Sequence, residues 1–191
     1  PDVAHSLLET VESLFVDARS DWTAACAAAL ISSGRLDEAH TILDEAGNEP
    51  KVQLSRARLA LLEDRPQDAI ELLEPHSDLG AHAYVHGQVL AELDEWEAAV
   101  DRLEFAAGAC ETSIEQAWAL ATLGRVHQDL GHDTKADRCL TSAMEKGSED
   151  VHLLAQVQHH RFEGAAAGLR LDEARTHLEE VIQILQRCGD R

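Results

Sequence analysis

One pair of residues recurs six times along the chain: an alanine followed four positions later by a leucine. The pairs are Ala4–Leu8, Ala39–Leu43, Ala69–Leu73, Ala99–Leu103, Ala136–Leu140 and Ala174–Leu178. Side chains four residues apart lie above one another on an α-helix, so each pair marks one apolar stripe of a helix. The five intervals between Ala4 and Ala174 average 34 residues. The stripe is therefore the strongest constraint on the fold, and we expect it to be core.

A repeat of this length is typical of stacked helical pairs rather than of one globular core. Gly34 suits the left-handed end of a helix, and Pro66 suits the first turn of one. We expect about eleven helices in an all-α chain. Their ranges are 2–16, 21–33, 35–46, 51–63, 66–74, 79–93, 95–107, 113–130, 133–146, 149–167 and 171–188.

The first helix carries the stripe that marks the second helix of every later pair. The array is therefore expected to begin midway through a repeat, with the missing first helix either upstream in a longer protein or absent. We divide the chain into residues 1–19, an N-terminal capping helix or half repeat, and residues 20–191, the helical repeat array.

The last helix has a wide apolar surface. We expect Ala174, Leu178, Val181 and Leu185 to face the preceding helix, while Ile182 and Ile184 widen the surface beyond that stripe. An open end of a repeat array exposes core. Another element follows, or this face packs on a partner or on a second copy; a self-association role predicts a concentration-dependent mass that Ile184→Glu reduces.

The charge of the chain is strongly negative, with 36 acidic and 16 basic residues and a net charge of -20. Such a field disfavours nucleic-acid backbones and anionic membranes, and it favours a neutral or basic protein partner. No apolar run is long enough to cross a bilayer and no signal-peptide pattern is present, so we expect a cytoplasmic location. The four cysteines are far apart, which argues against a disulfide framework or a local zinc site.

We call the alanine of each alanine–leucine pair the key alanine. In four of the repeats, a small residue stands twelve positions before it. These residues are Ala27, Ala57, Gly87 and Gly124; in the last repeat the position falls on Phe162 or Arg161. Together with the alanine–leucine stripe, this pattern resembles the tetratricopeptide repeat (TPR) family, in about five repeats plus an N-terminal half repeat. The resemblance implies a right-handed α-solenoid of antiparallel helix pairs that binds extended or helical peptides in a concave groove.

The same resemblance implies which residues line that groove, because the family uses its first helices there. The groove set is Arg58, Tyr84, Gln88, Trp118, Arg125 and Gln128. Arginine can fork onto a carboxylate, and a rigid aromatic side chain can anchor a partner. In the alternative interpretation, Trp118 packs between helices and the arginines pair with neighbouring acids.

The sequence contains no hydrolase elbow, phosphate-cradling loop, paired metal-ligand motif or dinucleotide fingerprint. His82 and His86 are four residues apart on one predicted helix, but no nearby Glu or Cys completes a metal site. We therefore predict no catalytic residue, cofactor or metal, and a noncatalytic scaffold for a protein or peptide partner. The alternatives are a regulatory sensor of a peptide or small ligand, and an accessory region of an enzyme whose catalytic domain lies outside this chain.

Overall fold

The computed structural model describes residues 18–189, without the side chains of the last two, and all its regular elements are helices. The chain divides into two compact units, residues 1–76 and 77–191, and each is described by itself. The first unit contains residues 18–32, α2 (Leu36–Asp44), α3 (Pro50–Leu62), α4 (Pro66–Leu73) and the 3-10 helix η1 (Glu74–His76). The second contains α5 (Gly80–Glu92), α6 (Trp96–Ala109), α7 (Ser113–Asp129), α8 (Asp133–Lys146), α9 (Val151–Ala167) and α10 (Leu171–Gly189).

These helices confirm the predicted fold class, since ten of the eleven predicted helices appear close to their predicted bounds. The predicted helix at 2–16 lies outside the described residues, and the predicted division at residue 19 stays a prediction. Among residues 18–189, no helix is both long enough and apolar enough to span a membrane.

The turn inside each helical pair is built the same way. The residue five positions before the key alanine has a positive φ between 56° and 73°; these residues are Gly34, Asp64, Asp94, Gly131 and Leu169. The N–H of the next residue donates to the carbonyl five positions back, as from Arg35 to Leu30 and from Arg170 to Ala165, both within 2.9 Å. This left-handed helix ending fixes where the second helix starts, so every stripe keeps one register.

The alanine–leucine stripe is core in four copies. The alanines and leucines of α2, α4, α6 and α8 are at most 1% exposed. Leu43 of α2 packs with Val52 and Leu59 of α3, and Leu140 of α8 packs with residues of α7 and α9. The leucine of α2 is thus covered by the next helix, and that of α8 by both its own first helix and the next one.

The copy in α10 corrects one prediction. Ala174 is buried, but Leu178 and Leu185 are 43% and 52% exposed, so neither is buried against the preceding helix. Val181 and Ile184, which are half-buried, lie closer to that contact. The reason is that no described helix covers the far side of α10.

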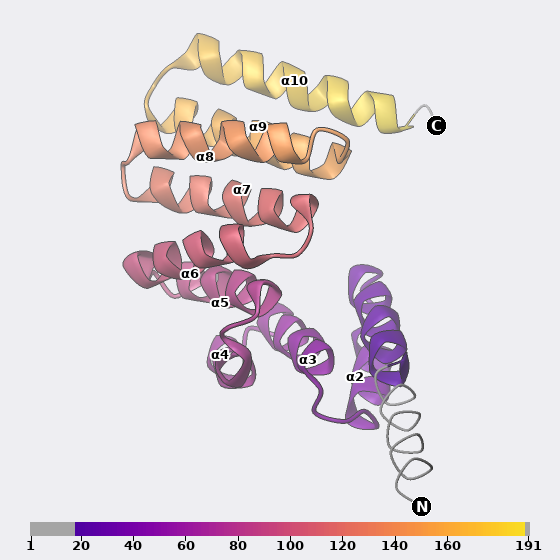
Figure 1. Ribbon diagram of the computed structural model, residues 1–191. Coiled ribbons are helices and arrows are strands. Elements are labelled where there is room, and N and C mark those ends of the chain that lie inside the picture. The colour runs from indigo at the N-terminus through magenta and orange to yellow at the C-terminus, as the bar shows by residue number, and fades with distance from the viewer. Residues whose placement is uncertain (1–17, 190–191) are drawn as a thin grey trace, which may run out of the picture. The chain divides into compact units, whose positions relative to one another are not determined.

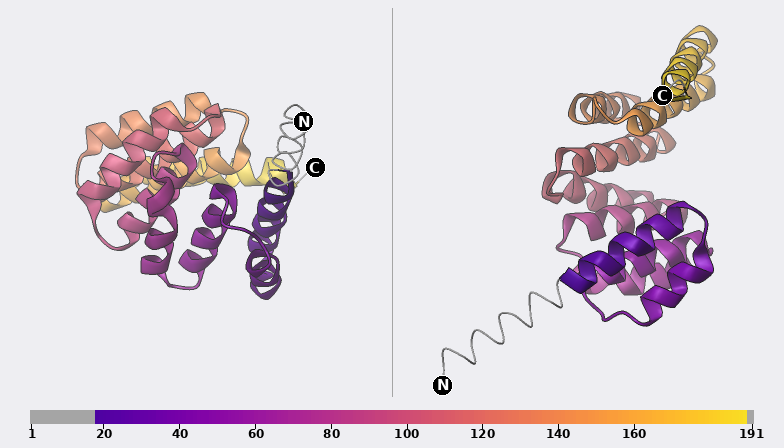
Figure 2. Two further views of the ribbon diagram at one scale, coloured as in Figure 1. Left: turned by 60° about the horizontal axis from the view of Figure 1, so that its bottom comes forward. Right: turned by 90° about the vertical axis from the view of Figure 1, so that its right-hand side faces the viewer.

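The second unit forms two layers. Figure 1 shows its helices stacked in chain order from α5 to α10, and the right-hand view of Figure 2 shows the same stack from the side. Consecutive helices contact each other, and α7 also contacts α5 and α9 directly. The first helices of successive pairs therefore make one continuous layer, which is the layer that carries the predicted groove residues.

Candidate functional site

The predicted groove residues fall on the first helices. Tyr84 and Gln88 belong to α5, and Trp118, Arg125 and Gln128 belong to α7. Arg58 lies on α3 of the other unit, so the structure does not bring it together with the remaining five. All six side chains are half-buried.

Tyr84 and Gln88 form a polar pair on α5. The amide Nε2 of Gln88 donates a hydrogen bond of 2.9 Å to the hydroxyl oxygen of Tyr84. The tyrosine ring packs against a buried cluster that contains Ala106, Cys110 and Ala119. The ring is therefore held rigidly while its polar tip stays on the helix surface, which suits an anchor for a partner.

Trp118 and Arg125 have structural partners of their own. Trp118 packs against the core cluster that includes Leu153 and Val157 of α9. The guanidinium Nη1 of Arg125 lies 3.1 Å from Oδ2 of Asp129, one turn along α7. These contacts match the alternative interpretation. Both side chains also keep exposed surface, 31% for the arginine, so a partner can reach them.

Gln128 joins two first helices. Its Nε2 donates to the carbonyl oxygen of His160 in α9 at 3.1 Å, across 32 residues of sequence. A Cβ added at Gly164 would lie 2.3 Å from the same Nε2. Glycine at 164 therefore leaves room for the Gln128 amide, whose hydrogen bond joins α7 to α9.

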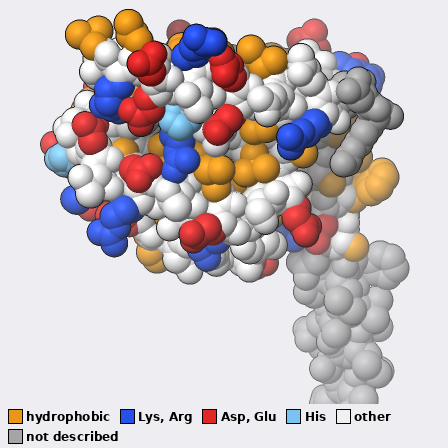
Figure 3. Space-filling model, turned by 90° about the horizontal axis from the view of Figure 1, so that it is seen from above, with side chains coloured by type: hydrophobic (Ala, Val, Ile, Leu, Met, Phe, Trp, Pro, Cys, Tyr) orange, Lys and Arg blue, Asp and Glu red, His pale blue; other side chains and the backbone are white. Residues whose placement is uncertain are grey.

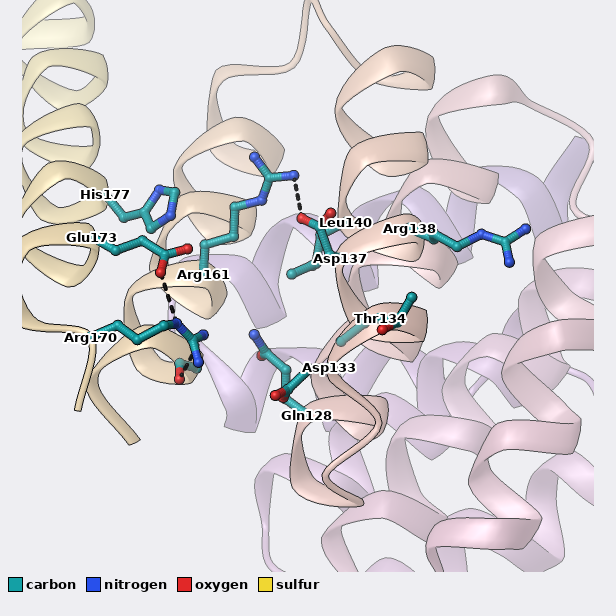
Figure 4. Close-up of a pocket in the computed structure, with 12 residues that line it drawn as sticks. Gln128, Asp133, Thr134, Asp137, Arg138, Leu140, Arg161, Arg170, Glu173 and His177 are labelled. Carbon is teal, nitrogen blue, oxygen red and sulfur yellow. Dashed lines mark hydrogen bonds and ion pairs between the residues drawn. The ribbon is translucent and has the colours of Figure 1, made fainter. Parts of the chain in front are cut away.

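A polar pocket of about 570 Å³ lies between α8, α9 and α10. Figure 4 shows Arg161 of α9 and Arg170 at the start of α10 on one side of it, with Asp133 and Asp137 of α8 opposite. Gln128 closes one end, and Arg138 points away from the centre. A neighbouring pocket of about 430 Å³ shares Gln128, Asp133, Gly164 and Arg170 and adds Arg125, Asp129 and Glu163.

Two arginines of the larger pocket are paired with acids that also line it. Arg161 Nη2 donates to Asp137 Oδ1 at 3.1 Å and to Thr141 Oγ1 at 2.8 Å. Arg170 Nε donates to Glu173 Oε2 at 2.7 Å. The residues that line the pocket include neither cysteine nor serine.

Burial shifts the pKa of several groups near this region. It lowers the pKa of His160, whose hydrogen bond to Glu163 opposes the shift, and it lowers the pKa of His127. Burial also raises the pKa of the thiols of Cys110 and Cys139, so neither is activated as a thiolate. These histidines are neutral packing groups at neutral pH.

Within the described part of the chain, no group of three His, Cys, Asp or Glu side chains could hold a metal ion. His82 and His86 are buried in α5, at 2% and 7% exposure. Both are therefore buried rather than on the surface of the helix.

The resemblance does not indicate Arg161 or Arg170, because the fifth repeat diverges from the pattern at Arg161 and because Arg170 lies in a turn, outside the first helices. The sequence does contain a pattern that indicates a role for Arg170 in its turn. Arginine stands four positions before the key alanine in three turns, and each pairs with an acid three residues later, as Arg35 with Glu38 and Arg65 with Asp68. No local pattern announces Arg161, whose partner lies 24 residues away.

Comparison with known proteins identifies both a sequence family and a fold. A family described as "T7SS, ESX-1 secretion system protein EccA1, N-terminal domain" matches residues 5–162. MamA matches with a TM-score of 0.59 at 22% identity, covering 86% of this chain and 97% of MamA. Pseudomonas aeruginosa PilF matches with a TM-score of 0.69 at 16% identity, covering 88% and 77%.

A third solved structure carries nearly identical TPR-like repeats and comes from a candidate kinesin light chain of Podospora anserina. It matches with a TM-score of 0.65 at 20% identity, covering 91% of this chain and 97% of that one. No curated protein sequence gives a significant match. Identities this low show the fold alone, and they confirm the resemblance to TPR helical repeats.

Proposed function

The chain belongs to the family of the N-terminal domain of the ESX-1 secretion system protein EccA1, and from this premise we propose that it is a noncatalytic protein-binding module of a type VII secretion system. It holds a segment of a protein partner against the layer formed by its first helices. Folds of this type serve many functions, so the proposal rests on the site and not on the fold alone.

The observation that carries the proposal is the continuous layer of α5, α7 and α9. Because α7 contacts both of its neighbours, side chains of three helices share one face without an intervening second helix. That face offers a rigid tyrosine, a half-buried tryptophan and a partly exposed arginine at Tyr84, Trp118 and Arg125. Large rigid anchors beside a charge are the typical composition of a protein-binding hot spot.

The net charge of the chain favours one kind of partner segment. The net charge of -20 attracts a segment with an excess of Lys and Arg from a distance, which raises the rate of encounter. At contact, Arg125 can exchange Asp129 for a carboxylate of the partner, because exposed ion pairs contribute little to stability. We therefore propose a predominantly basic segment with one carboxylate placed against Arg125.

Photo-crosslinking in cells that make this protein tests the proposal. A benzoylphenylalanine at Gln88 lies on the first-helix layer, whereas one at the exposed Glu104 of α6 lies on the second-helix layer and is the control. We expect a protein adduct of defined mass from position 88 and none from position 104. Adducts from 104 alone, or from neither position, would overturn the proposal.

Affinity variants then test individual groove residues with the partner segment that the adduct identifies. Trp118→Ala and Arg125→Glu should each weaken its binding about tenfold or more, because each removes an anchor. Arg102→Glu on α6 carries the same charge change outside the face and should leave the affinity unchanged apart from a small field effect. If both groove variants unfold, the two residues are structural and the assignment is wrong.

A further inference from the structure

Exposed apolar side chains gather on the last helix and the turn before it. Nine large hydrophobic side chains are exposed among the described residues, and five of them lie between residues 169 and 185. Leu171, Leu178, Ile182 and Leu185 follow one another at spacings of seven, four and three, so they form one stripe along α10. Figure 3 shows the molecule from above, from the side on which α10 lies in Figure 1, with hydrophobic side chains exposed among charged groups.

In α2 and α8, the equivalent stripe contacts aliphatic side chains of the next helix. Leu140 of α8 holds the position of Leu178, four residues after the key alanine, and it is 1% exposed. It packs in one cluster with Leu153 and Val157, two aliphatic side chains four residues apart on the next helix. The equivalent Leu43 packs with Val52 and Leu59 of the next helix, seven apart.

In two of the four covered second helices, the residue after the alanine of the pair forms an ion pair at the next helix, whereas in α4 and α6 this residue is aliphatic. In α2 it is His40, whose Nε2 lies 2.6 Å from Oε1 of Glu63 beyond the end of α3. In α8 it is Asp137, which pairs with Arg161 of α9 at 3.1 Å. In α10 the residue is Arg175. A helix that covers α10 should therefore bring aliphatic side chains at helical spacing and a carboxylate for this arginine.

The helix α10 itself has both features, namely aliphatic side chains at helical spacing and a carboxylate beside them. The positions 171, 174, 178, 182 and 185 are symmetric about 178, so an antiparallel copy places Leu171 opposite Leu185 and Leu178 opposite itself. The carboxylate of Glu179, which pairs with Arg175 of its own chain at 2.8 Å, borders the same stripe. We propose that two copies of this chain associate through α10 in an antiparallel pair, with the twofold axis at Leu178 and Arg175 of each copy facing Glu179 of the other.

The small area of the stripe limits the affinity of this association. Fifteen residues of helix, 171 to 185, are about 21 Å long, and two such faces bury well under the roughly 800 Å² per partner of a stable interface. Two chains of net charge -20 also repel each other. The dimer is therefore weak, and added salt strengthens it by screening the repulsion. This proposal does not depend on the groove, which lies on other helices.

Sedimentation equilibrium up to about 0.5 mM protein tests the association itself, a range suited to a weak interface. We expect the wild-type mass to rise toward two chains, and Leu178→Glu to stay monomeric because it places two carboxylates opposite each other. Phe105→Glu changes another exposed apolar residue, on α6, and should behave like wild type. Circular dichroism checks that each variant is folded. A monomeric wild type across the range would overturn the proposal and leave the stripe to a different partner.

A charge exchange tests the pairing. Arg175→Glu and Glu179→Arg should each weaken the homodimer, since each places like charges across the axis. Mixed together, the two variants should form a heterodimer tighter than either homodimer. A mixture no tighter than the separate variants would contradict the pairing of these two residues.

Cysteine crosslinking tests the antiparallel register in a chain with its four native cysteines replaced. Leu178→Cys should form a disulfide-linked dimer under mild oxidation, because residue 178 faces its own copy. Leu171→Cys and Leu185→Cys should crosslink when mixed and not separately. Efficient crosslinking of each of the three variants with itself would indicate a parallel pair and overturn the proposed axis.

Discussion

Leu169 occupies a backbone position that the other turns give to glycine or aspartate. Its φ is 56°, in the left-handed region where a Cβ is disfavoured, and its side chain is 81% exposed. Gly34 and Gly131 fill the same position without that cost. The turn before α10 therefore stores strain that the equivalent turns before α2 and α8 avoid.

Replacement of this leucine should stabilise the chain. We expect Leu169→Gly to raise the free energy of unfolding by about 1 kcal/mol, because it removes the left-handed penalty and loses no buried contact. Urea unfolding followed by circular dichroism measures the change. Gly131→Leu is the reverse substitution in the turn before α8 and should destabilise by a similar amount. A loss of stability in Leu169→Gly would mean that the exposed side chain makes a stabilising contact.

The buried histidines predict sensitivity to acid. Burial holds the pKa of His127 and His160 in the folded chain below the value of about 6.5 expected when unfolded. Below that pH the unfolded chain takes up protons first, so stability falls as the pH drops from about 6.5 toward the folded values. Unfolding at pH 7.5 and 5.5 measures the loss. It should shrink in His127→Gln, and an equal loss in that variant would contradict the assignment.

At the scale of the helical pair, glycine marks where two helices cross. A Cβ at Gly124 of α7 would lie 2.7 Å from Cγ and Cδ2 of the buried Leu140 in α8, and Gly87 faces Leu103 in the same way. By contrast, a Cβ at Gly108 of α6 would meet nothing within 4 Å. The small residue that precedes the key alanine by twelve is thus required by the leucine of the same repeat.

Alanine substitutions at Gly124 and at Gly108 should consequently change the free energy of unfolding in opposite directions. Gly124→Ala should lower the free energy of unfolding by about 1–3 kcal/mol, since crowding of the core outweighs the gain in helix propensity. Gly108→Ala should raise it by up to about 1 kcal/mol, since only the propensity changes. Thermal and urea unfolding of the two variants provide the measurement. Stabilisation by both would show that Leu140 moves aside freely.

The helices and their registers could be predicted from the sequence because local signals set them: the stripe, the small residue twelve before it and the turn. Contacts between repeats could not be predicted in this way. The bond from Gln128 to His160 and the pair of Arg161 with Asp137 join positions more than 20 residues apart, and no periodicity specifies them. Leu178 shows the limit most clearly, because it has the same local pattern as Leu140 and differs only in what covers it.

At the scale of the whole molecule, the proposed groove and the proposed dimer contact lie on different helices. The first helices of the second unit form the proposed groove, residues of α7 to α10 line the polar pocket, and the outer stripe of α10 forms the proposed dimer contact. A segment in the groove and a second copy on α10 should therefore bind independently. Leu178→Glu should leave the affinity for the partner segment unchanged, and isothermal titration of the monomeric variant checks this; a large loss would indicate coupling.

Fluorescence of Trp118 reports whether the partner segment binds on the first-helix layer. The chain has three tryptophans, so Trp22→Phe with Trp96→Phe leaves Trp118 as the sole reporter on the first-helix layer. Titration with the partner segment identified from position 88 should shift its emission with a saturable, single-site curve. Arg125→Glu should move that curve to about tenfold higher concentration or beyond. Saturable binding that leaves the emission of Trp118 unchanged would contradict binding in the groove, because the partner would then bind away from the first helices.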